Sequence, residues 1–192
     1  MSARAIGGLF LLIAAGAAAI RLGDLDRRPM HHDEANQAIK FGALLEKGEY
    51  RYDPEDHHGP SLYYLTVPAA WLGSERSLAD LTERTLRSVP ALSGVLTILL
   101  FWLLRDGIGA RSLLWAAILA ALSPAMVYYS RFYIQETLLM YLVIGAIGAG
   151  WRYAQRPGMV WAATAGVFAG AAAATKETWV VVLASASVAL LL

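Results

Sequence analysis

The chain has 192 residues, of which 57% are apolar and only 16% are charged. Soluble domains usually carry about 25% charged residues, so this balance indicates a membrane protein. The net charge of +1 gives no reason to expect a nucleic-acid partner, and the absence of cysteine excludes disulfides and thiolate metal sites.

Six stretches approach the roughly 20 apolar residues that a helix needs to cross a bilayer. They are 5–22, 88–104, 112–129, 137–151, 159–174 and 178–192. The first follows Arg4 and also fits a signal peptide, but we expect a retained anchor. The last reaches Leu192 without a cap or a polar flank, so we expect the N-terminal part of a longer protein. The predicted fold class is therefore an all-α, polytopic membrane helix bundle.

The segment 60–73 decides which side of the membrane the later loops face. It has 14 residues and is interrupted by Pro68, which suits a helix lying at the membrane surface better than a span. Its Tyr63, Tyr64 and Trp71 are residue types that gather at the membrane–water boundary.

With that segment lying flat, residues 23–87 form one long outer loop. We expect interfacial helices at about 34–47 and 60–73, followed by a solvated helix over the charged stretch 74–87. The short inner segments then hold five arginines against two basic residues in the short outer loops, in agreement with the positive-inside rule. This arrangement predicts a plasma-membrane protein whose polar loops face the extracytoplasmic side.

MHHDEANQA, which starts at Met30, places two acids at the beginning of a predicted helix. Asp33 in the first turn is consistent with two roles, and they do not exclude each other. It is a suitable N-cap, and acids there also suit the positive end of the helix dipole. Asp33 or Glu34 is equally a candidate general base beside the membrane surface.

All four histidines lie in the long loop, together with 12 of the 15 acidic residues. Imidazole and carboxylate groups are ligands for zinc and for harder divalent ions such as Mg²⁺ and Mn²⁺. The spacing matches no closed zinc signature, and a solvated loop with inert histidines is the alternative. The candidate metal ligands are His32, His57 and His58, with His31 beside them.

Two later turns place charged residues between strong spans, SRFYIQE at 130–136 and ATKETW at 174–179. Charged residues at span ends often only reach toward water. Arginine and lysine at an interface are also phosphate ligands. The candidate substrate-binding residues are Tyr129, Arg131, Glu136, Lys176 and Glu177.

Taken in order, these motifs resemble the GT-C glycosyltransferases, in particular the protein O-mannosyltransferases and the aminoarabinose transferases. The similar features are a first span, a long loop with the pair Asp33-Glu34 at a helix start, HHGPSLYYL at 57–65, SPAMVYYSRFYIQETLLMY at 123–141, and ATKE. Proteins of this superfamily are much longer and have more spans. The histidine-rich flanks are closer to the metal site of the aminoarabinose transferases.

The resemblance implies an enzyme that moves a sugar from a polyprenyl-phosphate carrier to a protein or glycolipid acceptor, with inversion and without a nucleotide cofactor. It implies that Asp33 acts on the acceptor and that Arg131 and Lys176 hold the carrier phosphate. Glu34, Glu136, His57 and His58 would orient the substrates or bind a divalent ion. Two rival interpretations are a lipid-linked oligosaccharide flippase, which needs no base, and a non-catalytic assembly subunit. The scarcity of polar residues within the spans counts against the flippase.

Overall fold

The computed structural model describes residues 2–53 and 58–191, and within these ranges the chain is helical with connecting turns and no strand. The predicted all-α class is confirmed. The helices are α1 (Ala3–Leu22), α2 (His32–Lys47), α3 (Ser61–Leu72), α4 (Glu83–Leu100), α5 (Arg105–Ile108), α6 (Ala110–Leu122), α7 (Pro124–Ser130), α8 (Gln135–Gln155), α9 (Met159–Ala173) and α10 (Trp179–Leu191). Two 3-10 turns, η1 and η2, cover Leu78–Asp80 and Phe101–Leu104.

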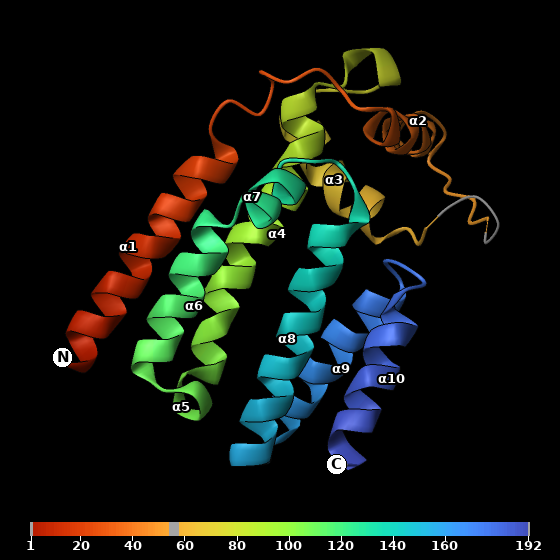
Figure 1. Cartoon of the computed structure of the whole chain (residues 1–192). Helices are drawn as coiled ribbons and strands as arrows, with labels where there is room; N and C mark the ends of the chain where they lie inside the picture. The colour runs from red at the N-terminus through yellow and green to blue at the C-terminus, as the bar shows by residue number, and fades with distance from the viewer. Residues whose placement is uncertain (1, 54–57, 192) are drawn as a thin grey trace.

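The long helices form a bundle in which α1, α4, α6, α8, α9 and α10 run roughly side by side (Figure 1). In the described chain, three helices are long and apolar enough to cross a membrane: Ala3–Leu22, Glu83–Ile108, which joins α4, η2 and α5, and Gln135–Gln155. They coincide with the stretches predicted at 5–22, 88–104 and 137–151. The stretches at 159–174 and 178–192 coincide with α9 and α10, which are apolar but shorter.

The stretch 112–129 is not one straight span. It is divided into α6 and α7, whose axes differ by 60°. Pro124 begins α7, and the Ser123 hydroxyl accepts the Met126 N–H as its N-cap. Proline has no N–H to continue the hydrogen-bond ladder of α6, which accounts for the break.

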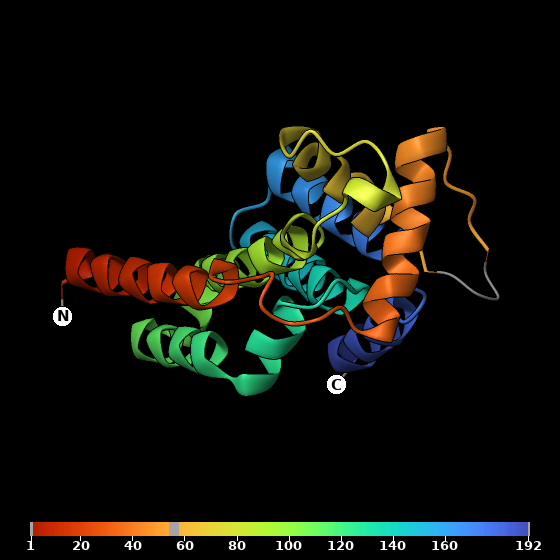
Figure 2. The ribbon, with the colours of Figure 1, turned by 90° about the horizontal axis from the view of Figure 1, so that it is seen from above.

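Helix α2 lies across one end of the bundle, viewed nearly along its axis in Figure 1 and along its length in Figure 2. It begins at His32, two residues before the predicted start, because the His31 side chain caps it in a capping box with Glu34. It ends at Lys47 and is capped by Gly48, whose φ of +71° is the left-handed conformation that favours glycine. The neighbouring α3 has 12 residues, too few to cross a bilayer core of ~30 Å.

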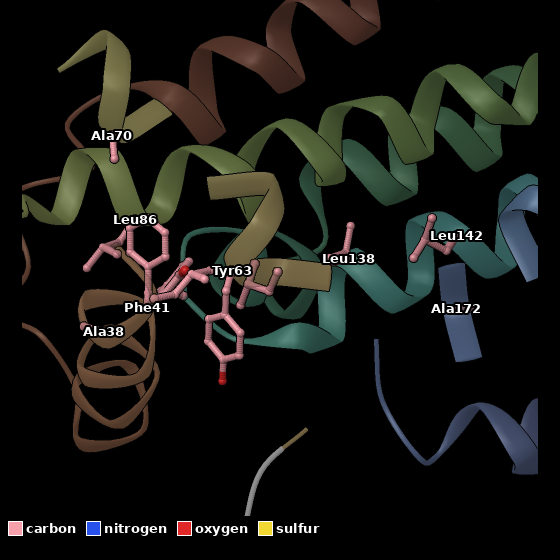
Figure 3. Packing of buried hydrophobic residues seen from close by; sticks show 11 residues of the cluster. Ala38, Phe41, Tyr63, Ala70, Leu86, Leu138, Leu142 and Ala172 are labelled. Carbon is pink, nitrogen blue, oxygen red and sulfur yellow. The ribbon is translucent and has the colours of Figure 1, made fainter. Parts of the chain in front are cut away.

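A hydrophobic core attaches α2 and α3 to the bundle (Figure 3). One cluster almost fully buries Phe41 of α2, Tyr63 of α3 and Leu86 of α4. The same cluster continues along α8. A second cluster, built around Phe10, Ile98 and Leu113, joins α1, α4 and α6. The surface helices are therefore fixed to the spans that carry the later polar turns.

Candidate functional site

The polar loops singled out in the sequence meet at the end of the bundle where α2 lies (Figure 1). The first turn of α2 is tied to the segment before α8, because the Tyr133 N–H donates to Glu34 Oε1 at 2.9 Å. One turn later, Gln135 Nε2 donates to Gln37 Oε1 at 2.9 Å. These bonds place the Asp33-Glu34 pair beside the turn that carries Arg131 and Glu136.

Glu34 is the centre of a buried ion-pair network. Arg87 of α4 donates from Nε to Oε1 at 2.7 Å and from Nη2 to Oε2 at 2.9 Å, a two-point contact. The His31 N–H and the Arg28 guanidinium also donate to Oε2, at 3.0 and 3.2 Å. The side chains of Glu34 and Arg87 are only 1% and 2% exposed, so this pair is sequestered from solvent.

These contacts determine the ionisation of Glu34. Burial alone would raise its pKa, but the hydrogen bonds from Arg87 and from the His31 and Tyr133 N–H groups outweigh it and hold the pKa below its ordinary value. Arg87 also donates to the carbonyl groups of Leu25 and Arg28, at 2.6 and 2.8 Å. Glu34 is therefore a carboxylate that orders the loop before α2.

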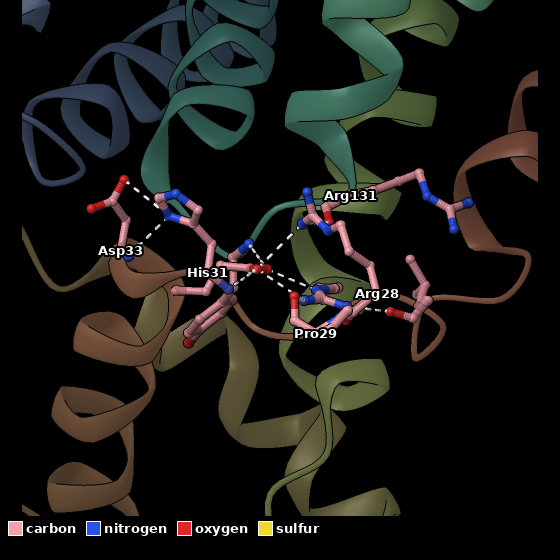
Figure 4. Close-up of polar contacts among 9 residues, drawn as sticks. Arg28, Pro29, His31, Asp33 and Arg131 are labelled. Carbon is pink, nitrogen blue, oxygen red and sulfur yellow. Dashed lines mark hydrogen bonds and ion pairs between the residues drawn. The ribbon is translucent and has the colours of Figure 1, made fainter.

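Asp33, by contrast, is open to solvent. Its side chain is 62% exposed, and Figure 4 shows it turned away from Arg28 and Pro29. The interpretation of Asp33 as N-cap is wrong, because His31 occupies that position and its Nδ1 accepts the Asp33 N–H at 3.2 Å. The same nitrogen lies 3.5 Å from Asp33 Oδ2, so the exposed carboxylate has an imidazole beside it (Figure 4).

Arg131 is half-buried at the turn between α7 and α8. Its guanidinium donates to the carbonyl of Ile20 at 2.5 Å and to that of Asp24 at 2.9 Å. These bonds link Arg131 to the C-terminal end of α1 and hold the guanidinium in place. A guanidinium has five N–H groups, and the two bonds leave further donors for an anion.

Glu136 and Lys176 form an ion pair that joins the first turn of α8 to the turn after α9. The Lys176 side chain is 15% exposed, whereas that of Glu136 is 43% exposed. The ammonium group is thus held at the rim of the bundle by a partner that is itself accessible from solvent.

Glu177 connects the same turn to the loop before α3. His58 Nδ1 lies 2.8 Å from Oε2, and the Tyr52 hydroxyl donates to Oε1 at 3.3 Å. Partial burial would raise the pKa of Glu177, but its own backbone N–H, His58 and Tyr52 lower it below the ordinary value. At Gly59 a Cβ would lie 2.1 Å from the Ala174 carbonyl oxygen, so only glycine permits this approach.

An apolar groove of about 190 Å³ begins beside the Glu136–Lys176 pair. It runs between α7 and α8 and is lined by Ala125, Met126, Tyr129, Glu136, Thr137 and Met140. Glu136 supplies the charged group of this lining. The groove thus joins a charged rim to the apolar side of the bundle.

The described candidate metal ligands do not form a metal site. His32 contacts Asn36 at 3.3 Å, while His58 is engaged by Glu177. Among the described residues, no three histidine or carboxylate side chains come together as an ion would require. His57 lies outside the described residues.

Arg28, Gln37, Arg87 and Gln135 belong to the site but were not predicted. The charged stretch 74–87 was expected to be a solvated helix, but α4 begins only at Glu83 and Arg87 is 1% exposed. The available signal was an arginine immediately before an apolar span. Its partner Glu34 is 53 residues earlier, so the pairing was not visible in the local pattern.

Comparison with protein families identifies a match to dolichyl-phosphate-mannose-protein mannosyltransferase over residues 68–192. No curated protein matches the chain. The matched range contains Arg87, Arg131, Glu136 and Lys176, whereas α2 with Asp33 and Glu34 precedes it. Because the match covers well over half of the chain, the protein belongs to the dolichyl-phosphate-mannose-protein mannosyltransferase family, membrane glycosyltransferases of the GT-C type that use polyprenyl-phosphate sugars as donors.

Proposed function

We propose that this chain carries the active site of an integral-membrane glycosyltransferase. The enzyme moves a sugar from a polyprenyl-phosphate carrier to a protein or glycolipid acceptor and inverts the anomeric carbon. The transfer takes place on the extracytoplasmic face of the plasma membrane. The observation that carries the proposal is the meeting of Asp33, Arg131 and the Glu136–Lys176 pair at one end of the bundle, beside an apolar groove. An amphipathic donor needs both a cationic rim and an apolar channel.

The donor is assigned to α7, α8 and the turn after α9. The groove lined by Met126, Tyr129 and Met140 accepts the start of the polyprenyl chain. Lys176 exchanges its Glu136 partner for the carrier phosphate, and Arg131 donates its remaining N–H groups. These cations stabilise the negative charge that develops on the phosphate as the sugar leaves. Glu177 and His58 hold the turn that carries Lys176.

The acceptor is assigned to the exposed start of α2. Asp33 takes the proton from the attacking hydroxyl group, while the carrier phosphate leaves from the opposite face of the sugar. Glu34 positions Asp33 through its bonds to Arg87 and Tyr133, without contacting the substrates. No step in this scheme passes through a metal ion.

The test is transfer by membranes that contain Asp33→Asn and are supplied with a polyprenyl-phosphate sugar. We expect transfer to fall by about 100-fold or more, the usual contribution of a general base, with no change in the unfolding midpoint. Asp26→Asn is the matched control, because Asp26 is an exposed carboxylate of the same loop, 3.6 Å from Arg84. Undiminished transfer by Asp33→Asn would remove Asp33 from this role.

A further inference from the structure

A second polar cavity lies at the end of the bundle opposite the candidate active site. It has a volume of about 450 Å³ and is lined by residues of η2, α5, the last turn of α8 and the start of α9. Helix α5 and that end of α8 lie at the far end of the bundle from α2 (Figure 1). Its charged lining residues are Arg105, Asp106, Arg152 and Arg156. The transfer reaction proposed above uses none of them.

The cavity carries an excess of positive charge. Asp106 is the one carboxylate among its described lining residues, and two arginines share it: Arg105 Nε lies 3.0 Å from Oδ1, and Arg152 is paired with Oδ2. Arg152 is further held by the Trp102 carbonyl at 3.2 Å. Three guanidinium groups against one carboxylate leave a formal charge of +2, with Arg156 as the arginine that Asp106 does not bind.

The cavity lies at the ends of two candidate spans, the level at which phospholipid headgroups are expected. It is bounded by the last residues of two spans, Glu83–Ile108 and Gln135–Gln155. Trp102 and Trp161 line it, and tryptophan at span ends is typical of the membrane–water boundary. The Arg105 guanidinium lies over the Trp102 ring at 4.8 Å, which keeps this charge at the wall of the cavity.

We propose that this cavity binds the phosphate of an anionic membrane phospholipid. Guanidinium groups match phosphate oxygens in a two-point fork, and basic pockets between spans are suited to anionic headgroups. Arg152, fixed by Asp106 and the Trp102 carbonyl, supplies a preset donor, and Arg156 supplies the charge that the lining leaves uncompensated.

The test uses the full chain in detergent micelles and measures retained lipid by native mass spectrometry. The probes are phosphatidylglycerol and phosphatidylcholine with identical acyl chains. We expect phosphatidylglycerol to be retained preferentially, and Arg156→Gln to weaken its retention about fivefold, the effect of one cationic side chain near a lipid surface. Gln155→Glu, which adds a carboxylate to the lining without removing an arginine, should weaken it as well.

The matched control is Arg111→Gln, because Arg111 is an exposed arginine of α6 at the same end that does not line the cavity. Equal losses in Arg156→Gln and Arg111→Gln would show a diffuse charge effect and overturn the site. So would equal retention of the two lipids by the unaltered chain. Displacement of phosphatidylglycerol by inorganic phosphate would overturn the lipid as the source of the phosphate.

Discussion

Asp33 and Glu34 are adjacent carboxylates with opposite surroundings, since one is 62% exposed and the other 1%. We expect Glu34→Gln to lower the free energy of unfolding by roughly 3–5 kcal/mol, because it leaves Arg87 buried without a counter-charge. Asp33→Asn should change it by less than about 0.5 kcal/mol, as exposed substitutions usually do. Thermal unfolding followed by tryptophan fluorescence in detergent measures both.

The pH dependence of the same variants tests whether the charge of Glu34 is responsible. Its pKa in the folded chain lies below the ordinary value of 4.5, so the unfolded chain binds more protons in that range. The ionised Glu34 carboxylate therefore makes its full contribution to the free energy of unfolding above about pH 4.5. This contribution is lost as the pH falls through the lower pKa of the folded chain. The difference between the unaltered chain and Glu34→Gln should narrow on acidification. A difference that stays constant from pH 7 to 3 would assign the effect to packing.

At the scale of the helices, a buried arginine of α1 donates to carbonyl groups at the break between α6 and α7. Pro124 cannot donate to the carbonyl of Ala120, four residues earlier. Arg21 Nη2 donates to that carbonyl instead, at 2.7 Å. Arg21 Nη1 donates to the next carbonyl, of Ala121, at 3.0 Å. A charged residue within a span often marks a functional site. The bonds to these two carbonyl groups indicate a structural role for Arg21 instead.

We expect Arg21→Met to destabilise the chain by about 1–3 kcal/mol, the usual cost of leaving buried acceptors unpaired. In a Pro124→Ala background the cost should be smaller, because an alanine N–H can bond to Ala120. Unfolding midpoints of the two single variants and the double variant form the cycle, with an expected coupling of about 0.5–3 kcal/mol. Strict additivity would show that the arginine does not compensate for the proline.

These same elements show how far the sequence can predict the structure. Apolar length was sufficient for α1, α4 and α8, and clustered polar residues indicated the end of the bundle where the candidate site lies. The bend at Pro124 was missed because apolar composition does not reveal which carbonyl groups lose their partners. Arg87 was missed because the burial of a charge depends on a partner that folding brings from a distant part of the chain.

At the scale of the whole molecule, the candidate active site and the arginine-lined cavity occupy opposite ends of the bundle (Figure 1). Because arginine-rich short loops stay on the inner side, we expect the α2 end to face outward. The chain has no cysteine, so single cysteines can be introduced without background from its own residues. Glu49→Cys should react with a membrane-impermeant maleimide in intact cells, and Gln155→Cys only after permeabilisation. Reaction of Gln155→Cys alone in intact cells would place Asp33 and Lys176 on the inner side and contradict the proposed extracytoplasmic transfer. The lipid-binding test of the arginine-lined cavity would be unaffected by that result.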